Sequence, residues 1–162
     1  MSIVAARIDN RLLHGIVAMQ WTPQYQPQRV MVIDDEFASD PTKKASMRMA
    51  RPAGVALSII SRETAYDNFA AGKYDDHTVF VITKNPEVLV HLLQGGQQIP
   101  VVVLGGTAEP EEGQAATQVS RRAYVTDAER SAYRAMIDAG CDVVVQYVPA
   151  DKPERLNACM DL

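Results

Sequence analysis

Short apolar runs, rich in valine and isoleucine, alternate along this chain with stretches that carry helix-start and helix-stop residues. This alternation is typical of an α/β fold, a single domain in which a mostly parallel open sheet has helices on both faces. The run at 78–83 is almost wholly apolar, which predicts a strand near the centre of the sheet, buried on both sides. The predicted strands span residues 3–6, 29–34, 55–60, 78–83, 101–104 and 142–148.

Capping residues predict where the helices between these strands begin. Asp40 and Ser61 are expected N-caps, with Pro41 at the first helical position after Asp40. Thr126 and Glu129 have the spacing of a capping box. The predicted helices span 17–21, 41–50, 64–71, 85–93 and 126–139, and a tail at 149–162 holds one short helix.

Other segments are predicted to lack helix. Pro23 and Pro27 indicate a loop over 22–28, because proline interrupts helical hydrogen bonding. Residues 108–114 are expected to form a second loop, followed by one short strand at 119–125. No repeat, low-complexity linker or shift in composition divides the 162 residues, so we expect one domain over 1–162.

Composition argues against several classes of protein. A net charge of −4, without a basic run interleaved with aromatics, disfavours a nucleic-acid binder. Cys141 and Cys159 fit a reducing cytosol better than a disulfide scaffold. The three scattered histidines have no metal-ligand spacing, so no metal and no other cofactor is expected. No apolar run approaches the ~20 residues of a membrane span and no signal peptide is recognisable, which predicts a cytoplasmic protein.

The densest group of reactive side chains lies between the first strand and the first helix, in Arg7-Ile8-Asp9-Asn10-Arg11-Leu12-Leu13-His14-Gly15. A strand-to-helix turn in this fold class directs free backbone N–H groups at the carboxyl edge of the sheet, where anions bind. Histidine is a nucleophile or proton carrier near neutral pH, and arginine binds phosphate well. The stretch therefore predicts that His14 receives a phosphoryl group. The alternative is a local ion pair of Asp9 with Arg11 beside an ordinary helix-start histidine.

The pattern R-x-D-x-R-L-x-H-G resembles the active-site signature of the IIB components of the mannose/fructose/sorbose family of the sugar phosphotransferase system (PTS). The family usually reads H-G-Q-V, whereas Ile16 follows Gly15 here, which puts any contact made by that glutamine in question. Further short matches occur in the family's order at residues 32–36, 49–55, 84–86, 104–107 and 145–149.

The resemblance implies a phosphocarrier that accepts a phosphoryl group on His14, through Nδ1, from a phosphorylated IIA protein or domain. It implies that the group then passes to a sugar held by the membrane subunits IIC and IID, the reaction of a protein-Nπ-phosphohistidine–sugar phosphotransferase. The chain would then associate with the inner face of the membrane through IIC and IID. The sugar and a homo-oligomeric state are left open. The start at Met1, close to the first strand, favours a separate chain over a IIA–IIB fusion.

Roles follow for the residues around His14. Arg11 and Arg7 are expected to neutralise and bind the transferring group, and the resemblance makes Arg11 the stronger candidate. The alternative for Arg7 is a strand residue facing solvent. Asp9 is expected to hold the imidazole in one tautomer or to fix Arg11, and its alternative is to cap the following turn.

Three glycines complete the expected phosphate site. Gly15, Gly105 and Gly106 are predicted phosphate-binding positions, since glycine lets backbone N–H groups approach an anion closely. The alternative for Gly105 and Gly106 is that they only end the strand at 101–104. Around this site we expect Leu12 or Ile16 to be exposed toward IIA, whereas Met19 and Trp21 are assigned to the core and Cys141 is expected to be buried.

Other functional classes are compared with this one. Asp34-Asp35-Glu36 would hold Mg²⁺ in a receiver-like signalling module, or form a solvated acidic turn that orders neighbouring arginines, which we favour. A dinucleotide-binding oxidoreductase would need G-x-G-x-x-G at the first strand–helix turn, where only Gly15 is present. The remaining alternative is a regulatory α/β binding module that has lost transfer activity.

Overall fold

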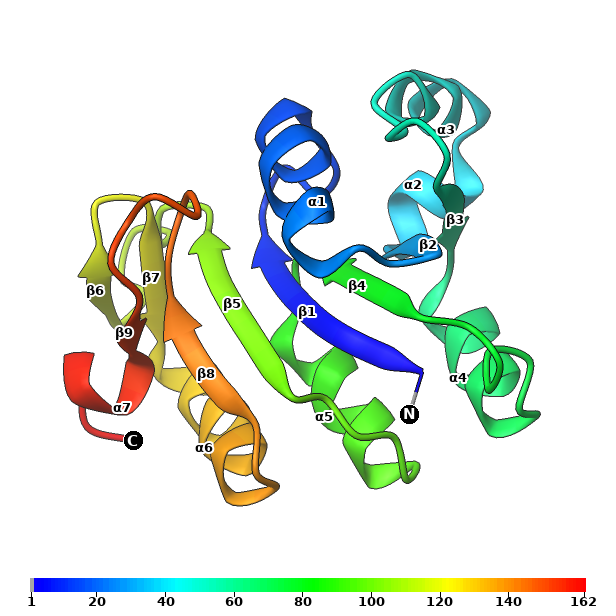
Figure 1. The fold of residues 1–162 in the computed structure, drawn as a ribbon. Coiled ribbons are helices and arrows are strands. Elements are labelled where there is room, and N and C mark those ends of the chain that lie inside the picture. The colour runs from blue at the N-terminus through cyan, green and yellow to red at the C-terminus, as the bar shows by residue number, and fades with distance from the viewer. Residues whose placement is uncertain (1) are drawn as a thin grey trace.

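The apolar runs form a seven-stranded sheet in the order β3-β2-β4-β1-β5-β8-β9. In this computed structural model, which describes residues 2–162, every strand pair of this sheet is parallel except that of β8 with β9. Met1, whose position favoured a separate chain, lies outside the described residues. Figure 1 shows β1 in the middle of the sheet. The strands are β1 (Ile3–Asp9), β2 (Arg29–Ile33), β3 (Ala56–Ile60), β4 (Val79–Thr83), β5 (Val101–Gly106), β8 (Asp142–Val145) and β9 (Glu154–Arg155).

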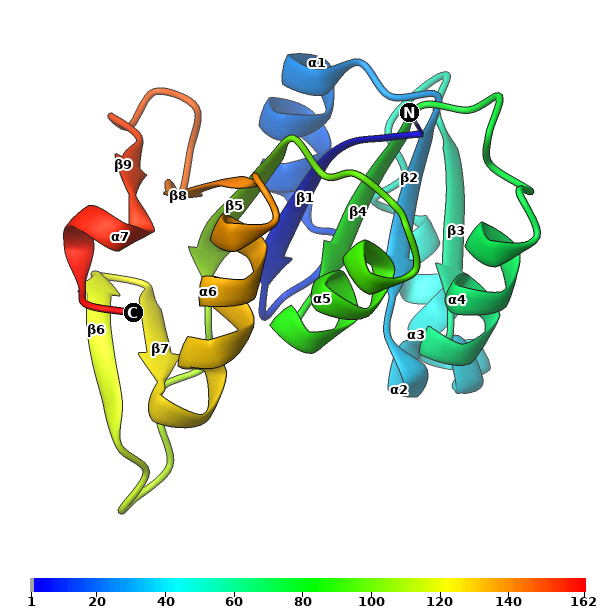
Figure 2. The same ribbon diagram turned by 90° about the horizontal axis from the view of Figure 1, so that it is seen from below.

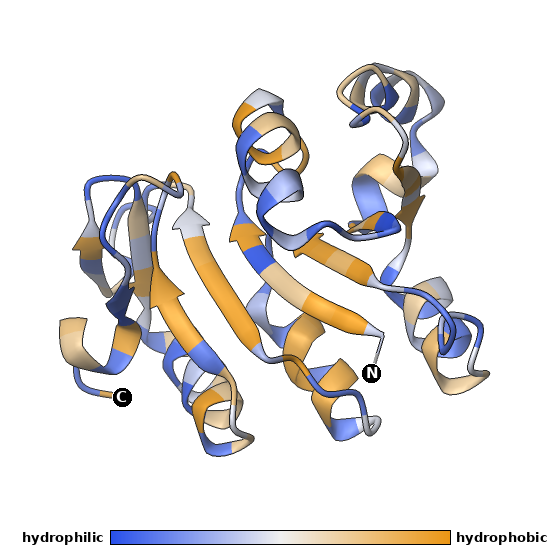
Figure 3. Ribbon diagram, in the orientation of Figure 1, coloured by the Kyte–Doolittle hydropathy of each residue, from blue (hydrophilic) through white to orange (hydrophobic). Residues whose placement is uncertain are grey.

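Both faces of the sheet are buried because successive residues of a strand point to opposite sides. In β4, Val79 and Val81 belong to one apolar cluster, whereas Phe80 and Ile82 belong to the other. The first cluster is covered by α4 (Arg62–Ala70), α5 (Pro86–Gln94) and α6 (Arg130–Asp138), and the second by η1 (Val17–Trp21) with α1 (Thr22–Tyr25). Figure 2 shows these helices on the two sides of the sheet. Figure 3 shows how strongly apolar the central strands are, and the predicted fold class is confirmed.

The predicted caps are confirmed. Asp40 accepts hydrogen bonds from the backbone N–H groups of Thr42 and Lys43 at the start of α3 (Pro41–Arg48). Ser61 caps α4. The capping box of Thr126 and Glu129 opens a 3-10 turn, η2 (Asp127–Glu129), that leads into α6. The remaining helices are α2 (Asp35–Ser39) and α7 (Leu156–Cys159), and no helix among residues 2–162 is long and apolar enough to cross a membrane.

The loop predicted over 22–28 is wrong, because the first helix continues through Pro23. Residues 17–21 form a π-helix, and the Thr22 N–H bonds to the carbonyl oxygen of Val17, five residues earlier. Pro23 is the second residue of α1, which follows this π-helix directly. The helix ends at Gln26, which is in the left-handed conformation.

Two strand predictions also need correction. The single strand predicted at 119–125 is an antiparallel hairpin of β6 (Ala116–Ser120) and β7 (Ala123–Thr126), turning at residues 121–122. The sequence lacks the Asn-Gly or Asp-Gly signal of a tight hairpin. The last strand, predicted over 142–148, ends at Val145, because the carbonyl groups of Gln146 and Tyr147 accept hydrogen bonds from Arg7 instead.

A buried hydroxyl on α6 yields a stability test. Tyr133 is wholly buried, and its hydroxyl oxygen has no hydrogen-bond partner among residues 2–162. Burial raises the pKa of the phenol, so the group is neutral. Because an unpaired buried polar group is destabilising by about 1–3 kcal/mol, Tyr133→Phe should raise the free energy of unfolding by about 1 kcal/mol in urea. The matched control is Tyr74→Phe, which loses the hydrogen bond from Asn68 and should lower it. A stability loss in Tyr133→Phe would contradict the unpaired assignment.

Candidate functional site

Strand β1 carries Arg7 and Asp9 to the carboxyl end of the sheet, where Asp9 becomes the centre of a buried cluster. The carboxylate is only 1% exposed. Its Oδ2 lies 3.1 Å from Nε of Arg7 and 3.0 Å from Nε2 of His14. Its Oδ1 accepts a 2.9 Å hydrogen bond from the backbone N–H of Arg11. One carboxylate therefore contacts both the ring of His14 and the backbone of the turn before it.

The contact with Asp9 decides which nitrogen of the neutral His14 ring carries the hydrogen. Burial alone would raise the pKa of the Asp9 carboxyl, but hydrogen bonds from His14 and the Arg11 N–H, together with the charge of Arg7, bring this pKa below its usual value. Asp9 is therefore ionised and can only accept, so Nε2 of His14 carries the hydrogen. The neutral imidazole then has its lone pair on Nδ1, which is the nitrogen available for attack.

The loop that carries His14 is tightly held. Leu12 has a φ of 58° and a fully buried side chain, and its N–H bonds to the carbonyl oxygen of Asp9. A left-handed conformation costs a non-glycine residue about 1–2 kcal/mol, which the burial of the leucine offsets. The carbonyl of His14 accepts from Ala18 N–H and so begins the helix. The first helical turn, from Gly15, leaves N–H groups without an intrahelical acceptor.

Arg7 lies beneath this loop and not in an open anion site. Its side chain is 0% exposed, and Nη1 and Nη2 donate to the carbonyl oxygens of Gln146 and Tyr147 at 3.2 and 3.0 Å. The guanidinium carbon lies 4.9 Å from the centre of the Trp21 ring. Burial lowers the pKa of Arg7 and the Asp9 charge opposes this, but a guanidinium remains charged at neutral pH. This burial contradicts both predictions for Arg7, as a phosphate ligand and as a residue facing solvent.

Arg11 has the opposite environment. It is exposed, and its guanidinium takes part in no ion pair within the described part of the chain. It lines a cavity of about 210 Å³ together with Gly106 and the hairpin residues Arg121 and Arg122. Arg122 stacks on the ring of Tyr147 at 4.1 Å. The two hairpin arginines were not predicted as site residues, because their proximity to Arg11 depends on a hairpin that has no local turn signal.

The three predicted glycines occupy different places. Gly15 is exposed at the start of the helix, and Gly106 lines the cavity beside Arg11. Gly105 is buried within β5, and a Cβ atom there would lie 2.0 Å from Nη2 of Arg7. Gly105 therefore makes room for Arg7 and does not face an open phosphate site. Both Gly105 and Gly106 belong to β5, and Gly106 is its last residue.

Each residue of the acidic stretch Asp34-Asp35-Glu36 has a partner of its own. Asp34 caps α2 through the Phe37 N–H. Asp35 forms an ion pair with Arg62 at 2.9 Å, and Glu36 pairs with Lys43. The stretch thus orders neighbouring basic residues, and no group of three potential metal ligands is found among residues 2–162.

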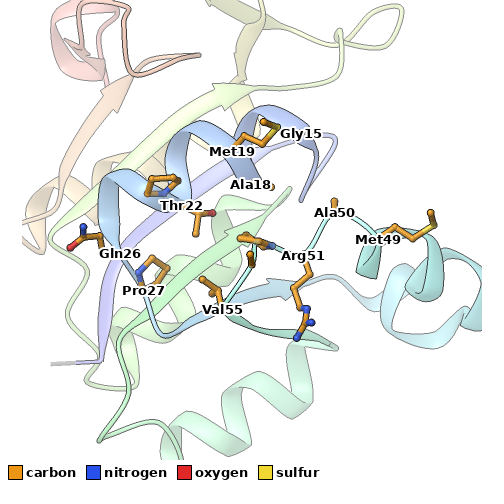
Figure 4. A pocket seen from close by; sticks show the side chains of 13 residues that line it. Gly15, Ala18, Met19, Thr22, Gln26, Pro27, Met49, Ala50, Arg51 and Val55 are labelled. Carbon is orange, nitrogen blue, oxygen red and sulfur yellow. The ribbon is translucent and has the colours of Figure 1, made fainter.

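An apolar groove begins beside His14. It has a volume of about 640 Å³ and lies between the first helix and the loop that follows α3 (Figure 4). Met19 and Met49, on its two sides, are 78% and 89% exposed, so the assignment of Met19 to the core is wrong. Leu12 is fully buried, which contradicts its expected exposure, and Ile16 is half-buried. Trp21 and Cys141 are buried as predicted.

The chain is similar to known proteins over its whole length. The family model described as "PTS system sorbose subfamily IIB component" matches residues 3–162. The fructose-specific EIIB component of Bacillus subtilis is 27% identical over 95% of this chain and 93% of its own length. The mannose-specific EIIAB component of Escherichia coli K12 is 31% identical over 100% of this chain, which spans 48% of that relative.

Solved structures agree with these similarities. The IIBSor domain of the Klebsiella pneumoniae sorbose permease superposes with a TM-score of 0.87 at 26% identity, covering 98% of this chain and 96% of that one. The N-acetylgalactosamine-specific IIB component 1 of Escherichia coli gives a TM-score of 0.83 at 29% identity, covering 96% and 99%. The family resemblance found in the sequence is confirmed. The chain therefore belongs to the sorbose subfamily of PTS IIB components, the phosphotransferases of the sugar PTS that work with IIA and IIC/IID partners.

Proposed function

We propose that residues 1–162 form a IIB domain in which Nδ1 of His14 accepts a phosphoryl group from a phosphorylated IIA protein or domain and passes it to a sugar held by IIC and IID. The observation that carries this proposal is the 3.0 Å contact between Asp9 Oδ2 and His14 Nε2. Because that contact uses Nε2–H, the lone pair on Nδ1 is left for attack on phosphorus.

The transfer balances without a cofactor. Nδ1 of His14 attacks phosphorus while the N–P bond to the IIA histidine breaks, and the bonding electrons return to the IIA imidazole. The ring of His14 then gains positive charge, which the Asp9 carboxylate stabilises through Nε2–H. In the second step a sugar hydroxyl oxygen attacks phosphorus, the N–P electrons return to Nδ1, and the hydroxyl proton passes to a base outside this chain.

Positive groups in the segment around His14 supply charge for the phosphoryl oxygens. Arg11 is exposed and free of ion pairs within the described range, and the first turn of the helix adds backbone N–H groups near Gly15. These donors take the place that magnesium has in kinases. Arg7 contributes indirectly, since it is buried behind Asp9.

The apolar groove supports a docking surface for IIA. It starts at Gly15, directly after His14, and its edges carry the most exposed large apolar side chains of the described residues, Met19 and Met49. Exposed apolar residues rimmed by polar ones favour protein contacts. A IIA protein covering this groove would bring its phosphohistidine next to Nδ1 of His14.

His14→Ala should abolish labelling by phosphorylated IIA, because no other nucleophile lies in the cluster. The measurement is intact mass with site mapping after incubation with phosphorylated IIA, and the label should be labile in acid and stable in base, as expected of a phosphohistidine. His91→Gln, which alters a surface residue stacked on Tyr66, is the matched control and should label normally. Labelling that persists in His14→Ala, or that depends on Mg²⁺ and has acyl-phosphate stability, would refute the proposal.

Arg11→Ala should slow transfer from IIA, because the loss of one preorganised charged donor raises the activation free energy by about 2–4 kcal/mol. Arg11→Lys should recover part of the rate, since the charge returns without the two-pronged geometry. Rapid-quench kinetics measure both, with Arg134→Ala on the far helix α6 as control. Parental rates in both Arg11 variants would show that Arg11 does not bind the transferring group.

Met49→Asp should weaken IIA binding without altering the chemistry of His14. An apolar contact at an interface contributes about 1–2 kcal/mol, so we expect the KM for phosphorylated IIA to rise about tenfold with kcat retained. Gln98→Asp, at the opposite end of the sheet, is the control for an added surface charge. An unchanged KM in Met49→Asp would place the IIA interface elsewhere.

A further inference from the structure

Gly105 lies where the sheet is too crowded for any side chain. The register between β1 and β5 shifts after Ile8, so that Asp9 pairs with Gly106 and Gly105 is the extra residue. A Cβ atom at Gly105 would lie 2.0 Å from Nη2 and 2.2 Å from Cζ of Arg7, whereas real Cβ contacts under 3.0 Å essentially never occur. A glycine inside a strand often marks such a bulge or close approach.

The guanidinium that passes Gly105 is held by partners on several sides. Arg7 donates to Asp9 and to the carbonyl oxygens of Gln146 and Tyr147. The Tyr147 carbonyl is fixed in turn by a 2.8 Å hydrogen bond from Nε1 of Trp21, and the Trp21 ring covers the guanidinium. Because Arg7 is completely enclosed, a side chain at position 105 must displace it and break these contacts together.

Displacement of Arg7 would reach His14 through a single carboxylate oxygen. Oδ2 of Asp9 accepts from both Nε of Arg7 and Nε2 of His14. Without Arg7, Asp9 loses the buried cation that holds Oδ2 and is free to turn away from the ring.

We infer that Gly105 is a positioning residue of the phosphoryl-accepting site: its missing side chain admits Arg7, which holds the Asp9 carboxylate against Nε2 of His14. Gly105 contacts neither His14 nor a substrate. The kinetic consequence rests on the proposed function, whereas the effect on Asp9 and His14 can be measured without any partner protein.

The kinetic test is a double-mutant cycle of Gly105→Ala with Arg7→Met. Each single variant should accept the phosphoryl group from phosphorylated IIA about 100-fold more slowly, a typical cost of misplacing a reacting group. The double variant should be no slower than the single ones, because Gly105 acts only through Arg7. Gly95→Ala, at the end of α5 with ordinary φ, is the control and should react at the parental rate. A parental rate in Gly105→Ala, or additive losses in the double variant, would overturn the inference.

The partner-free test is NMR of Gly105→Ala and of the parent protein. The Asp9 carboxyl should titrate at higher pH in the variant, and the ring ¹⁵N shifts of neutral His14 should move from one tautomer toward a mixture of two. Unchanged spectra would overturn the inference. If the parent protein accepts no phosphoryl group while these spectra change as expected, the proposed function fails and the positioning role stands.

A folding defect in Gly105→Ala would also be informative. If the variant unfolds, adding Arg7→Met removes the guanidinium that the new methyl group meets, and circular dichroism should show the fold restored. The restored double variant should still accept phosphoryl groups as slowly as Arg7→Met alone. If the double variant is unfolded under conditions in which Arg7→Met alone is folded, the steric conflict lies elsewhere and the inference is wrong.

Discussion

The buried ion pair of Arg7 with Asp9 is the interaction on which the site depends. Removing both charges from water costs several kcal/mol for each ion, and only close partners offset that cost. Arg7 has such partners in Asp9 at 3.1 Å, two carbonyl oxygens and the face of Trp21. Removing one partner would leave an unpaired charge in the core, which typically lowers the free energy of unfolding by about 3–5 kcal/mol. The end of β1 is therefore fixed against β5 and the segment after β8.

Arg7 of β1 and Arg11 of the following loop differ in environment, because one is enclosed and the other is exposed. Arg7 fixes Asp9 from inside the sheet, whereas Arg11 is exposed and donates its backbone N–H to Asp9 Oδ1. Asp9 thus holds the His14 ring with one oxygen and the backbone of the Arg11 turn with the other. A movement of this carboxylate would displace both together.

Local patterns predicted most of the fold, and long-range contacts account for the errors. The apolar runs and the caps at Asp40 and Ser61 are local signals, and both kinds of prediction were confirmed. The role of Arg7 was missed because its carbonyl partners lie 139 and 140 residues further along the chain. Gly105 was misassigned for the same reason, because only the position of the Arg7 side chain shows that a Cβ atom at residue 105 would clash.

A phosphocarrier must release the group that it binds, and the geometry around His14 suits that requirement. The hydrogen bond from Nε2 to Asp9 is present before the transfer and orients the ring. It therefore stabilises the phosphorylated ring over the free ring only by its stronger interaction with the new positive charge. In the proposed transfer, Arg11 would attract the phosphoryl oxygens from an exposed position, where solvent and salt weaken the interaction. A second buried cation facing Nδ1 would hold the phosphoryl group more tightly and slow its transfer to the sugar. Enclosing Arg7 behind Asp9 instead gives the site rigidity without that excess affinity.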